Sequence, residues 1–173
     1  MQNQYFYNKN KIIMISKTKN TAPGTYTQIH IQSVFAVRHR EALMDVSWRD
    51  RLYQYLSAII NDQGHRALSI GGTDNHIHIL FGMRPNQSLS SLMLRVKRET
   101  SKWINDNHFC GGRFEWQSGY GAFSYSKSQL PKVVAYIQNQ EQHHAKRSFR
   151  DEYLDMLRKA EVNFDERYIF EDI

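Results

Sequence analysis

Two histidines stand two positions apart in the otherwise apolar segment DNHIHILFG, which covers residues 74–82. In a β-strand, the side chains of residues i and i+2 project from the same face of the sheet. His76 and His78 are therefore expected side by side on one face, with the apolar side chains between and after them on the other. Two neutral imidazoles in this arrangement can bind one divalent metal ion, although a complete site needs further ligands from another element.

A second group of polar side chains comes later, in and after the segment VVAYIQNQEQHH. Four of them recur at intervals of four, three and four residues, which places them on one stripe of a helix: Tyr136, Gln140, His143 and Arg147. A tyrosine one turn from an oxygen ligand suits metal-assisted phosphoryl transfer, in which the phenol attacks phosphorus and forms a covalent phosphotyrosine. The pKa of a free phenol is about 10, so a neighbouring group must accept the proton. His143, His144 or a metal-bound water could do so.

Each of these features also has an ordinary structural explanation, and the residues alone leave both open. A His-apolar-His pattern is short, and the chain has eight histidines. A tyrosine on an amphipathic helix commonly packs against the core, and the helix dipole favours histidines near a helix C-terminus. The chemistry therefore depends on whether the fold brings the two segments together.

The charge distribution indicates a partner with many negative charges. The formal net charge is +6, and residues 84–150 alone contain 11 lysines and arginines against 4 aspartates and glutamates. Such a basic region can neutralise phosphates and release counterions, as in nucleic-acid binding. It includes the stripe Arg95, Arg98 and Lys102 and an aromatic-rich loop. The stripe could equally be a solvated helix face, and the aromatic rings could belong to the core rather than stack on bases.

Composition and length predict one globular domain. The chain has 173 residues, 40% of them apolar, which is enough for one core and short for two. Cys110 is the single cysteine, so no intramolecular disulfide can form, and a reducing, cytoplasmic setting is expected. No apolar run approaches the roughly 18 residues of a membrane span. Residues 1–24 are polar and lack a period, so we expect a flexible N-terminal extension before one domain over residues 25–173.

Hydrophobic periodicity predicts the elements that position the candidate residues. Alternating apolar residues predict strands, and apolar residues at helical spacing predict helices. The predicted strands cover residues 26–37, 66–72, 75–83 and 121–126; the predicted helices begin after Asp45 or Ser47 and near Ser88, and cover residues 129–144 and 149–160. The helix over residues 129–144 carries Tyr136.

This order is that of a ferredoxin-like or RRM-like α+β fold (βαββαβ), an antiparallel sheet with two helices on one face. Here additional C-terminal helices follow, and they carry the tyrosine. Because Ile77, Ile79 and Phe81 suit the core beneath the two helices, His76 and His78 should lie on the open face. There, either another element covers the histidines or a substrate binds to them.

The segment DNHIHIL resembles the His-hydrophobic-His motif of the HUH endonuclease superfamily, and VVAYIQNQ resembles the single-tyrosine motif of its small transposases. Those enzymes move insertion sequences as single-stranded DNA, and REP-associated tyrosine transposases are close relatives. The similarity covers nearly the whole domain, from YTQIHIQSVFAVRHR to the tail ERYIF. It implies that Tyr136 is the catalytic nucleophile, that His76, His78 and Gln140 are metal ligands, and that Mg²⁺ or Mn²⁺ is the cofactor.

The resemblance also implies the reaction and the partners. The expected activity is that of a metal-dependent tyrosine transposase, which cleaves and rejoins single-stranded DNA through a 5′-phosphotyrosine intermediate and needs no ATP. The expected partners are single-stranded DNA with a hairpin and a second copy of the chain in a homodimer, with no membrane involved. DNA contacts are expected from Arg95, Arg98, Lys102, Arg113, Trp116 and Tyr120.

Other functions stay open on the sequence. A host-adopted copy that acts on chromosomal repeats would use the same chemistry. A non-catalytic hairpin-binding module could share the fold, because the sheet of RNA-recognition domains also presents aromatic rings, but HIHILFG lacks their Lys/Arg-Gly-Phe signature. Larger HUH enzymes, such as replication initiators and relaxases, are disfavoured by the length of the chain.

Overall fold

The computed structural model describes residues 24–39, 42–144 and 148–171, apart from the side chains of residues 143 and 144. The expected N-terminal extension therefore lies almost wholly outside the described residues. The elements follow in the order β1 (Ile29–Ala36), α1 (Val46–Asp62), β2 (Arg66–Gly72), β3 (His76–Met83), α2 (Leu89–Asp106), β4 (Gly121–Ser124), η2 (Lys127–Gln129), α3 (Leu130–Gln138), α4 (Gln140–His144), α5 (Phe149–Lys159) and η3 (Glu166–Tyr168), where η marks a 3-10 helix.

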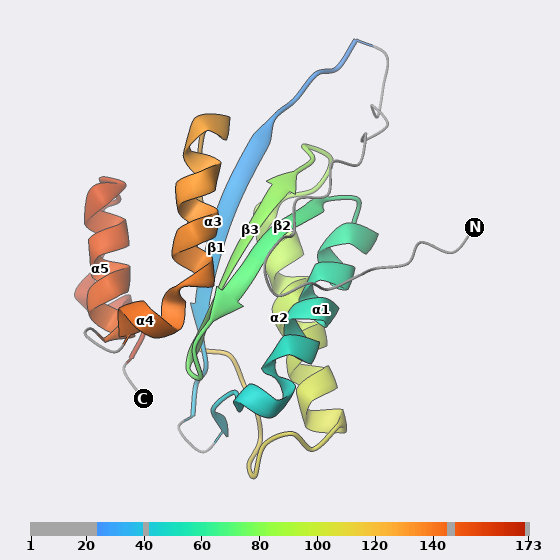
Figure 1. The fold of residues 1–173 in the computed structure, drawn as a ribbon, viewed down its shortest axis with the longest axis vertical. Coiled ribbons are helices and arrows are strands. Elements are labelled where there is room, and N and C mark those ends of the chain that lie inside the picture. The colour runs from blue at the N-terminus through green and yellow to red at the C-terminus, as the bar shows by residue number, and fades with distance from the viewer. Residues whose placement is uncertain (1–23, 40–41, 145–147, 172–173) are drawn as a thin grey trace.

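The four strands form one antiparallel sheet in the order β2-β3-β1-β4, with β3 and β1 in its centre. Helices α1 and α2 cover one face, and α3 and α5 lie on the opposite face (Figure 1). This arrangement confirms the predicted ferredoxin-like α+β fold with additional C-terminal helices. Among the described residues, no helix combines the length and the apolar character that crossing a membrane requires.

Local side-chain chemistry fixes where the first two helices begin and end. The Asp45 carboxylate accepts a hydrogen bond from the Ser47 backbone N–H, so Asp45, one of the two predicted residues, is the N-cap of α1. Ser88 caps α2 in the same way, with its hydroxyl oxygen accepting from the Ser91 N–H. Gly64 has a φ of +82°, a left-handed conformation that favours glycine and ends the α1 segment.

The main core lies between the sheet and the helices α1 and α2. Ile77, Ile79 and Phe81 of β3 are fully buried there, as their alternation predicts. They pack with the apolar stripes of the two helices, which include Leu52 and Leu56 of α1. The opposite face of β3, with the two histidines, therefore faces α3 and α5.

That second face is also buried, although the alternating apolar and polar residues of β1 favour a strand with one solvated face. The alternation places Gln32 on a polar, solvated face, but Gln32 is 1% exposed. Its neighbours Ser33 to Ala36 are buried as well. The physical reason is that the C-terminal helices cover this face, so a strand that reads as amphipathic is covered on both sides.

The prediction of a single helix over residues 129–144 is wrong, because the helix is interrupted at Asn139. α3 ends at Gln138, Asn139 leaves the helical conformation with φ −103° and ψ 21°, and α4 begins at Gln140. Tyr136 and Gln140 thus lie on separate helices. After the break, Glu141 of α4 pairs with Arg49 near the start of α1 at 3.1 Å, which ties the short helix to the other side of the molecule.

Glycine at position 71 of β2 permits the close approach of α3, and a methyl group there is expected to displace the helix. A Cβ atom on Gly71 would lie 2.4 Å from the backbone oxygen of Ile137. We expect Gly71→Ala to lower the free energy of unfolding by about 1–3 kcal/mol. Urea denaturation followed by circular dichroism measures this change.

Gly82→Ala is the matched control, because a Cβ there would meet its nearest heavy atom, Arg66 Cβ, only at 3.8 Å. Both variants add one methyl group to a strand of the same sheet. Equal unfolding midpoints for the two variants would show that α3 does not pack closely on Gly71 in solution.

Candidate active site

The two histidines of the DNHIHIL segment lie side by side on the face of the sheet that α3 and α5 cover, as predicted. Their ring centroids are 5.0 Å apart and the rings are nearly perpendicular, at 89°. Both side chains are 0% exposed. In the sheet register His76 lies opposite Ala36, and His78 opposite Val34. These two neighbours on β1 are small or apolar, so the side chains directly opposite offer the imidazoles no hydrogen bond.

His76 is held between the β2–β3 turn and the C-terminal helices. Its Nδ1 lies 2.8 Å from Asn75 Oδ1 and 3.0 Å from Thr73 Oγ1. Its Nε2 lies 3.1 Å from Gln140 Oε1. The Phe149 ring of α5 stacks on the imidazole at 4.2 Å between centroids and 14° between planes. The Nδ1 atom thus has its partners in the β2–β3 turn, and the Nε2 atom points toward the predicted ligand Gln140.

The two nitrogens of His78 likewise face different elements, Nδ1 toward β1 and Nε2 toward α5. Its Nδ1 lies 3.0 Å from the amide nitrogen Nε2 of Gln32, and its Nε2 lies 3.3 Å from Glu152 Oε1. That second contact is short enough for an ion pair but does not have hydrogen-bond geometry, and His78 Nε2 has no hydrogen-bond partner among the described residues. A buried nitrogen without a hydrogen bond is costly unless another ligand binds it.

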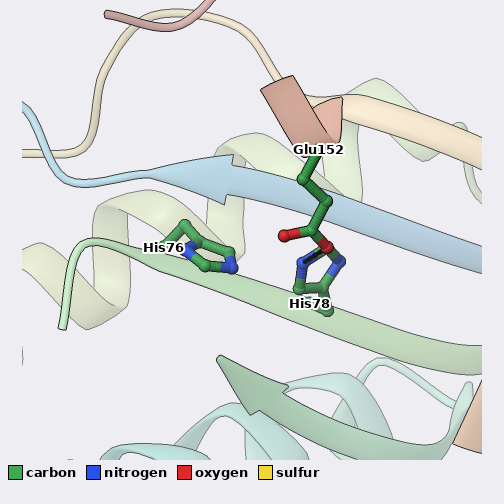
Figure 2. Close-up of side chains that lie close together, drawn as sticks. All are labelled: His76, His78 and Glu152. Atoms are coloured by element: carbon green, nitrogen blue, oxygen red, sulfur yellow. Dashed lines mark ion pairs between the residues drawn. The ribbon is translucent and has the colours of Figure 1, made fainter. Parts of the chain in front are cut away.

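Glu152 on α5 completes this cluster, and the sequence prediction missed it. The carboxylate is 8% exposed and accepts a hydrogen bond from Gln140 Nε2 at 3.1 Å. One ligand atom each from His76, His78 and Glu152 lies within 4.8 Å of the others, and Figure 2 shows the three side chains pointing toward one another. A signal existed in the sequence: Glu152 falls on the apolar stripe of α5 with Phe149, where an acidic residue is unusual.

The donor set fits a divalent metal ion. If His76 Nδ1 donates to the Asn75 oxygen, its neutral ring presents a lone pair at Nε2 that faces another acceptor, Gln140 Oε1. Together with His78 Nε2 and the Glu152 carboxylate, this gives two nitrogen and two oxygen atoms that could bind an ion at the buried face of the sheet. Imidazole and carboxylate ligands of this kind bind Mn²⁺ and similar ions, and Mg²⁺ favours the oxygen atoms.

Tyr136 lies beside this cluster, on the last turn of α3. Its ring approaches the His78 ring edge-on, with centroids 5.5 Å apart and planes at 79°. Its hydroxyl donates to the sulfur of Met156 at 3.9 Å, a weak contact with α5. The fold therefore brings together Tyr136, both histidines and Gln140. The side chains of His143 and His144, the predicted proton acceptors or alternative ligands, lie outside the described residues, as does Arg147.

The predicted basic stripe is not near this site. Arg95, Arg98 and Lys102 are exposed on α2, which covers the other face of the sheet. Arg95 pairs with Glu99 at 2.7 Å, and Lys102 pairs with Asp106. Such i,i+4 pairs are typical of a solvated helix surface. A role in DNA binding for this stripe stays a prediction, and it would concern DNA bound away from the histidines.

The aromatic loop packs against the core, which is one of the two alternatives that the sequence leaves open. Trp116 is 7% exposed, its ring packs edge-on against Phe35 at 4.7 Å, and its indole N–H donates to Thr100 Oγ1. The ring is therefore largely covered by the core, and a DNA contact by Trp116 stays a prediction. Tyr120 is partly buried against the same core. Arg113 is exposed and pairs with Glu115 at 3.0 Å, so it alone of this loop group offers a charged group to a phosphate.

Fold and site together define a class of protein. An antiparallel sheet that carries a His-Ile-His pair, with a tyrosine-bearing helix packed over the same face, is the arrangement of single-tyrosine HUH transposases. The chain belongs to the transposase family described as IS200-like, whose family model matches residues 25–140. This match includes both histidines, Tyr136 and Gln140, and stops before Glu152. No curated protein sequence matches the chain.

Solved structures show the same fold. A crystal structure of a candidate transposase from Deinococcus radiodurans R1 is 16% identical, with a TM-score of 0.55 over 70% of this chain and 98% of the other. A REP-associated tyrosine transposase bound to a REP hairpin is 13% identical, also with a TM-score of 0.55, over 90% of this chain and 99% of the other. The second likeness extends over more of the chain.

Proposed function

We propose that this transposase cleaves and rejoins single-stranded DNA through a 5′-phosphotyrosine formed on Tyr136. A divalent metal ion would be held by His76, His78, Gln140 and Glu152. The observation that carries the proposal is the buried cluster of two imidazole nitrogens and two side-chain oxygens directly beside the tyrosine ring. A purely structural sheet face would not bury so many polar ligand atoms around one point.

The proposed reaction exchanges one phosphate ester for another. The Tyr136 oxygen attacks the phosphorus, the P–O bond to tyrosine forms, and the P–O3′ bond breaks. The leaving 3′ oxygen takes up a proton and becomes a 3′-OH, while the phenol gives up its own proton. A later 3′-OH attacks the phosphotyrosine and reseals the strand. Because each step forms and breaks one ester bond, no ATP is consumed.

The metal ion, when bound, would polarise a non-bridging oxygen of the scissile phosphate. The residues of the chain supply the remaining requirements. The central strand β3 carries both imidazoles, and the ring of His78 packs edge-on against the Tyr136 ring. Phe149 and Glu152 of α5 cover the histidines, which are fully buried. Because Gln140 on α4 and Glu152 on α5 are themselves proposed ligands, a phosphate would have to enter through a movement that keeps both side chains at the metal ion.

We also propose a DNA hairpin as the recognised substrate and a homodimer as the working form. The hairpin is supported by the likeness to the transposase bound to a REP hairpin, and by the basic composition of residues 84–150. In this structure α3 packs on β2 and β3 of its own chain, so Tyr136 reaches the histidines without a second copy. Sedimentation of the protein with and without DNA tests the dimer.

The experiment that tests the reaction uses labelled single-stranded oligonucleotides. They carry the end sequences of the insertion sequence that encodes this protein. The protein is incubated with them in Mn²⁺ or in EDTA, and covalent adducts are separated by denaturing electrophoresis. Digestion and mass spectrometry then locate the attached nucleotide. The expected result is a covalent adduct in the samples with Mn²⁺ and none in the samples with EDTA. The attached nucleotide is expected on the peptide that contains Tyr136.

Other outcomes would replace the proposal. Cleavage without an adduct would indicate hydrolysis by activated water instead of attack by tyrosine. Tight binding without cleavage, unchanged by EDTA, would indicate a non-catalytic hairpin-binding module. Adduct formation on chromosomal repeats, but not on element ends, would indicate a host-adopted enzyme with the same chemistry.

A further inference from the structure

Gln32 on β1 is a buried amide that the proposed chemistry does not use. It lies opposite Leu80 in the sheet, two positions along β1 from the Val34–His78 pair and on the same face, and it is 1% exposed. Its Nε2 lies 3.0 Å from His78 Nδ1. A buried amide costs free energy unless its hydrogen bonds are satisfied, so this contact with the histidine is its main visible compensation.

The tautomer of a histidine decides which of its nitrogens can bind a metal ion. A neutral imidazole carries one hydrogen, and the nitrogen without it holds the free lone pair. For Nε2 to bind a metal, Nδ1 must carry the hydrogen and needs an acceptor as its partner. His76 has such an acceptor, because Asn75 Oδ1 lies 2.8 Å from its Nδ1.

His78 has a partner of a different kind. The amide of Gln32 presents its NH₂ group to Nδ1, which requires Nδ1 to be the acceptor and puts the hydrogen on Nε2. That hydrogen then lies on the side of Glu152 Oε1, at 3.3 Å between heavy atoms. In this arrangement His78 cannot bind a metal through Nε2. A half-turn of the terminal amide would bring the Gln32 oxygen to Nδ1 and reverse the assignment.

We propose that Gln32 is a positioning residue that keeps a hydrogen bond to Nδ1 in both tautomers of His78 and so lets Nε2 bind a metal ion. Without metal, its NH₂ group donates to Nδ1; with metal at Nε2, its oxygen accepts from Nδ1–H. The inference rests on the proposed metal site. An amide can serve both states because it carries a donor and an acceptor at the same end. A carboxylate would serve only the metal-binding tautomer, and an apolar side chain would serve neither.

The test measures the tautomer of His78 directly and the metal affinity separately. The ring ¹⁵N chemical shifts of the full chain are recorded without metal and with Zn²⁺, a diamagnetic ion that takes nitrogen and oxygen ligands. Mn²⁺ affinity is measured by calorimetry with the ion alone. The wild type is expected to change from the Nε2–H tautomer to the Nδ1–H tautomer when Zn²⁺ binds.

Two substitutions of Gln32 distinguish the proposal from a general packing role. Gln32→Met keeps the size and removes the hydrogen bonds, and it is expected to weaken Mn²⁺ binding by about 10–100-fold. Gln32→Glu supplies an acceptor alone, so His78 is expected in the Nδ1–H tautomer even without metal, with Mn²⁺ bound at least as tightly as in the wild type. Circular dichroism confirms that each variant is folded.

Gln87→Met is the matched control, because Gln87 forms a similar pair with another histidine. Its Oε1 lies 2.8 Å from His65 Nε2, at a partly buried position outside the cluster. This variant is expected to bind Mn²⁺ like the wild type. Wild-type affinity in Gln32→Met, or an unchanged His78 tautomer in Gln32→Glu, would overturn the proposal. If the wild type binds no Mn²⁺, the metal site itself fails, and the metal-free spectra of Gln32→Glu still decide whether the hydrogen bond from position 32 determines the His78 tautomer.

Discussion

Tyr136→Phe is expected to abolish the covalent protein–DNA adduct and to lower strand cleavage by at least about 10⁴-fold, as loss of a nucleophile does in other enzymes. The substitution removes the hydroxyl and keeps the aromatic ring that packs beside His78. The lost contact with the Met156 sulfur, at 3.9 Å, is weak. We therefore expect the variant to fold and to bind Mn²⁺ like the wild type, so that the loss is chemical. Gel separation of the adduct and calorimetry with Mn²⁺ measure the two effects.

Tyr168→Phe is the control for Tyr136→Phe. Tyr168 lies in η3 and is 82% exposed, so its hydroxyl takes no part in the cluster. This variant should form the adduct at the wild-type rate. If Tyr136→Phe still forms the adduct, and mass spectrometry locates the attached nucleotide on a peptide of the variant, the nucleophile is another residue.

Glu152→Gln is expected to weaken Mn²⁺ binding by at least about tenfold, because it removes the one negative charge in the cluster and leaves the shape of the side chain unchanged. The carboxylate is almost fully buried and lies between Gln140 Nε2 and His78 Nε2. By linkage, a tenfold weaker affinity removes about 1.4 kcal/mol of the stabilisation that excess Mn²⁺ gives the folded chain. Thermal unfolding with and without Mn²⁺ measures this difference.

Glu141→Gln provides a matched control on the neighbouring helix α4. The Glu141 side chain is 73% exposed and pairs with Arg49, outside the cluster. The Glu141→Gln variant should gain the same thermal stabilisation from Mn²⁺ as the wild type. If Mn²⁺ stabilises Glu152→Gln as much as the wild type, Glu152 is not a metal ligand. The histidines and Gln140 would then be the remaining proposed ligands.

Local rules of the sequence determined several features of this protein. The period of two along β3 placed His76 and His78 on one face, and the structure confirms this because their rings lie 5.0 Å apart. The order of strands and helices predicted the ferredoxin-like sheet. The N-cap aspartate at position 45 and the serine at position 88 predicted where two helices begin. Each of these depends on residues close together in the chain.

Only the tertiary structure decided what covers the histidine face. Alternation along β1 assigns Gln32 to a polar side, but it cannot show that α3 and α5 bury that side. Nor can it show that β1 pairs with β3 and so brings the amide to His78. The contacts of Trp116 with Phe35 and Thr100 could not be predicted either, because both residues lie on elements distant in the sequence.

Glu152 shows the physical reason most clearly. Helical spacing fixes the side of α5 on which the carboxylate lies, whereas its meeting with His78 depends on how α5 packs against a strand far away in the sequence. Periodicity assigns a side chain to a face of its own element. The element that packs against that face is selected by the burial of apolar surface over the whole chain, and that selection placed the carboxylate beside the two histidines.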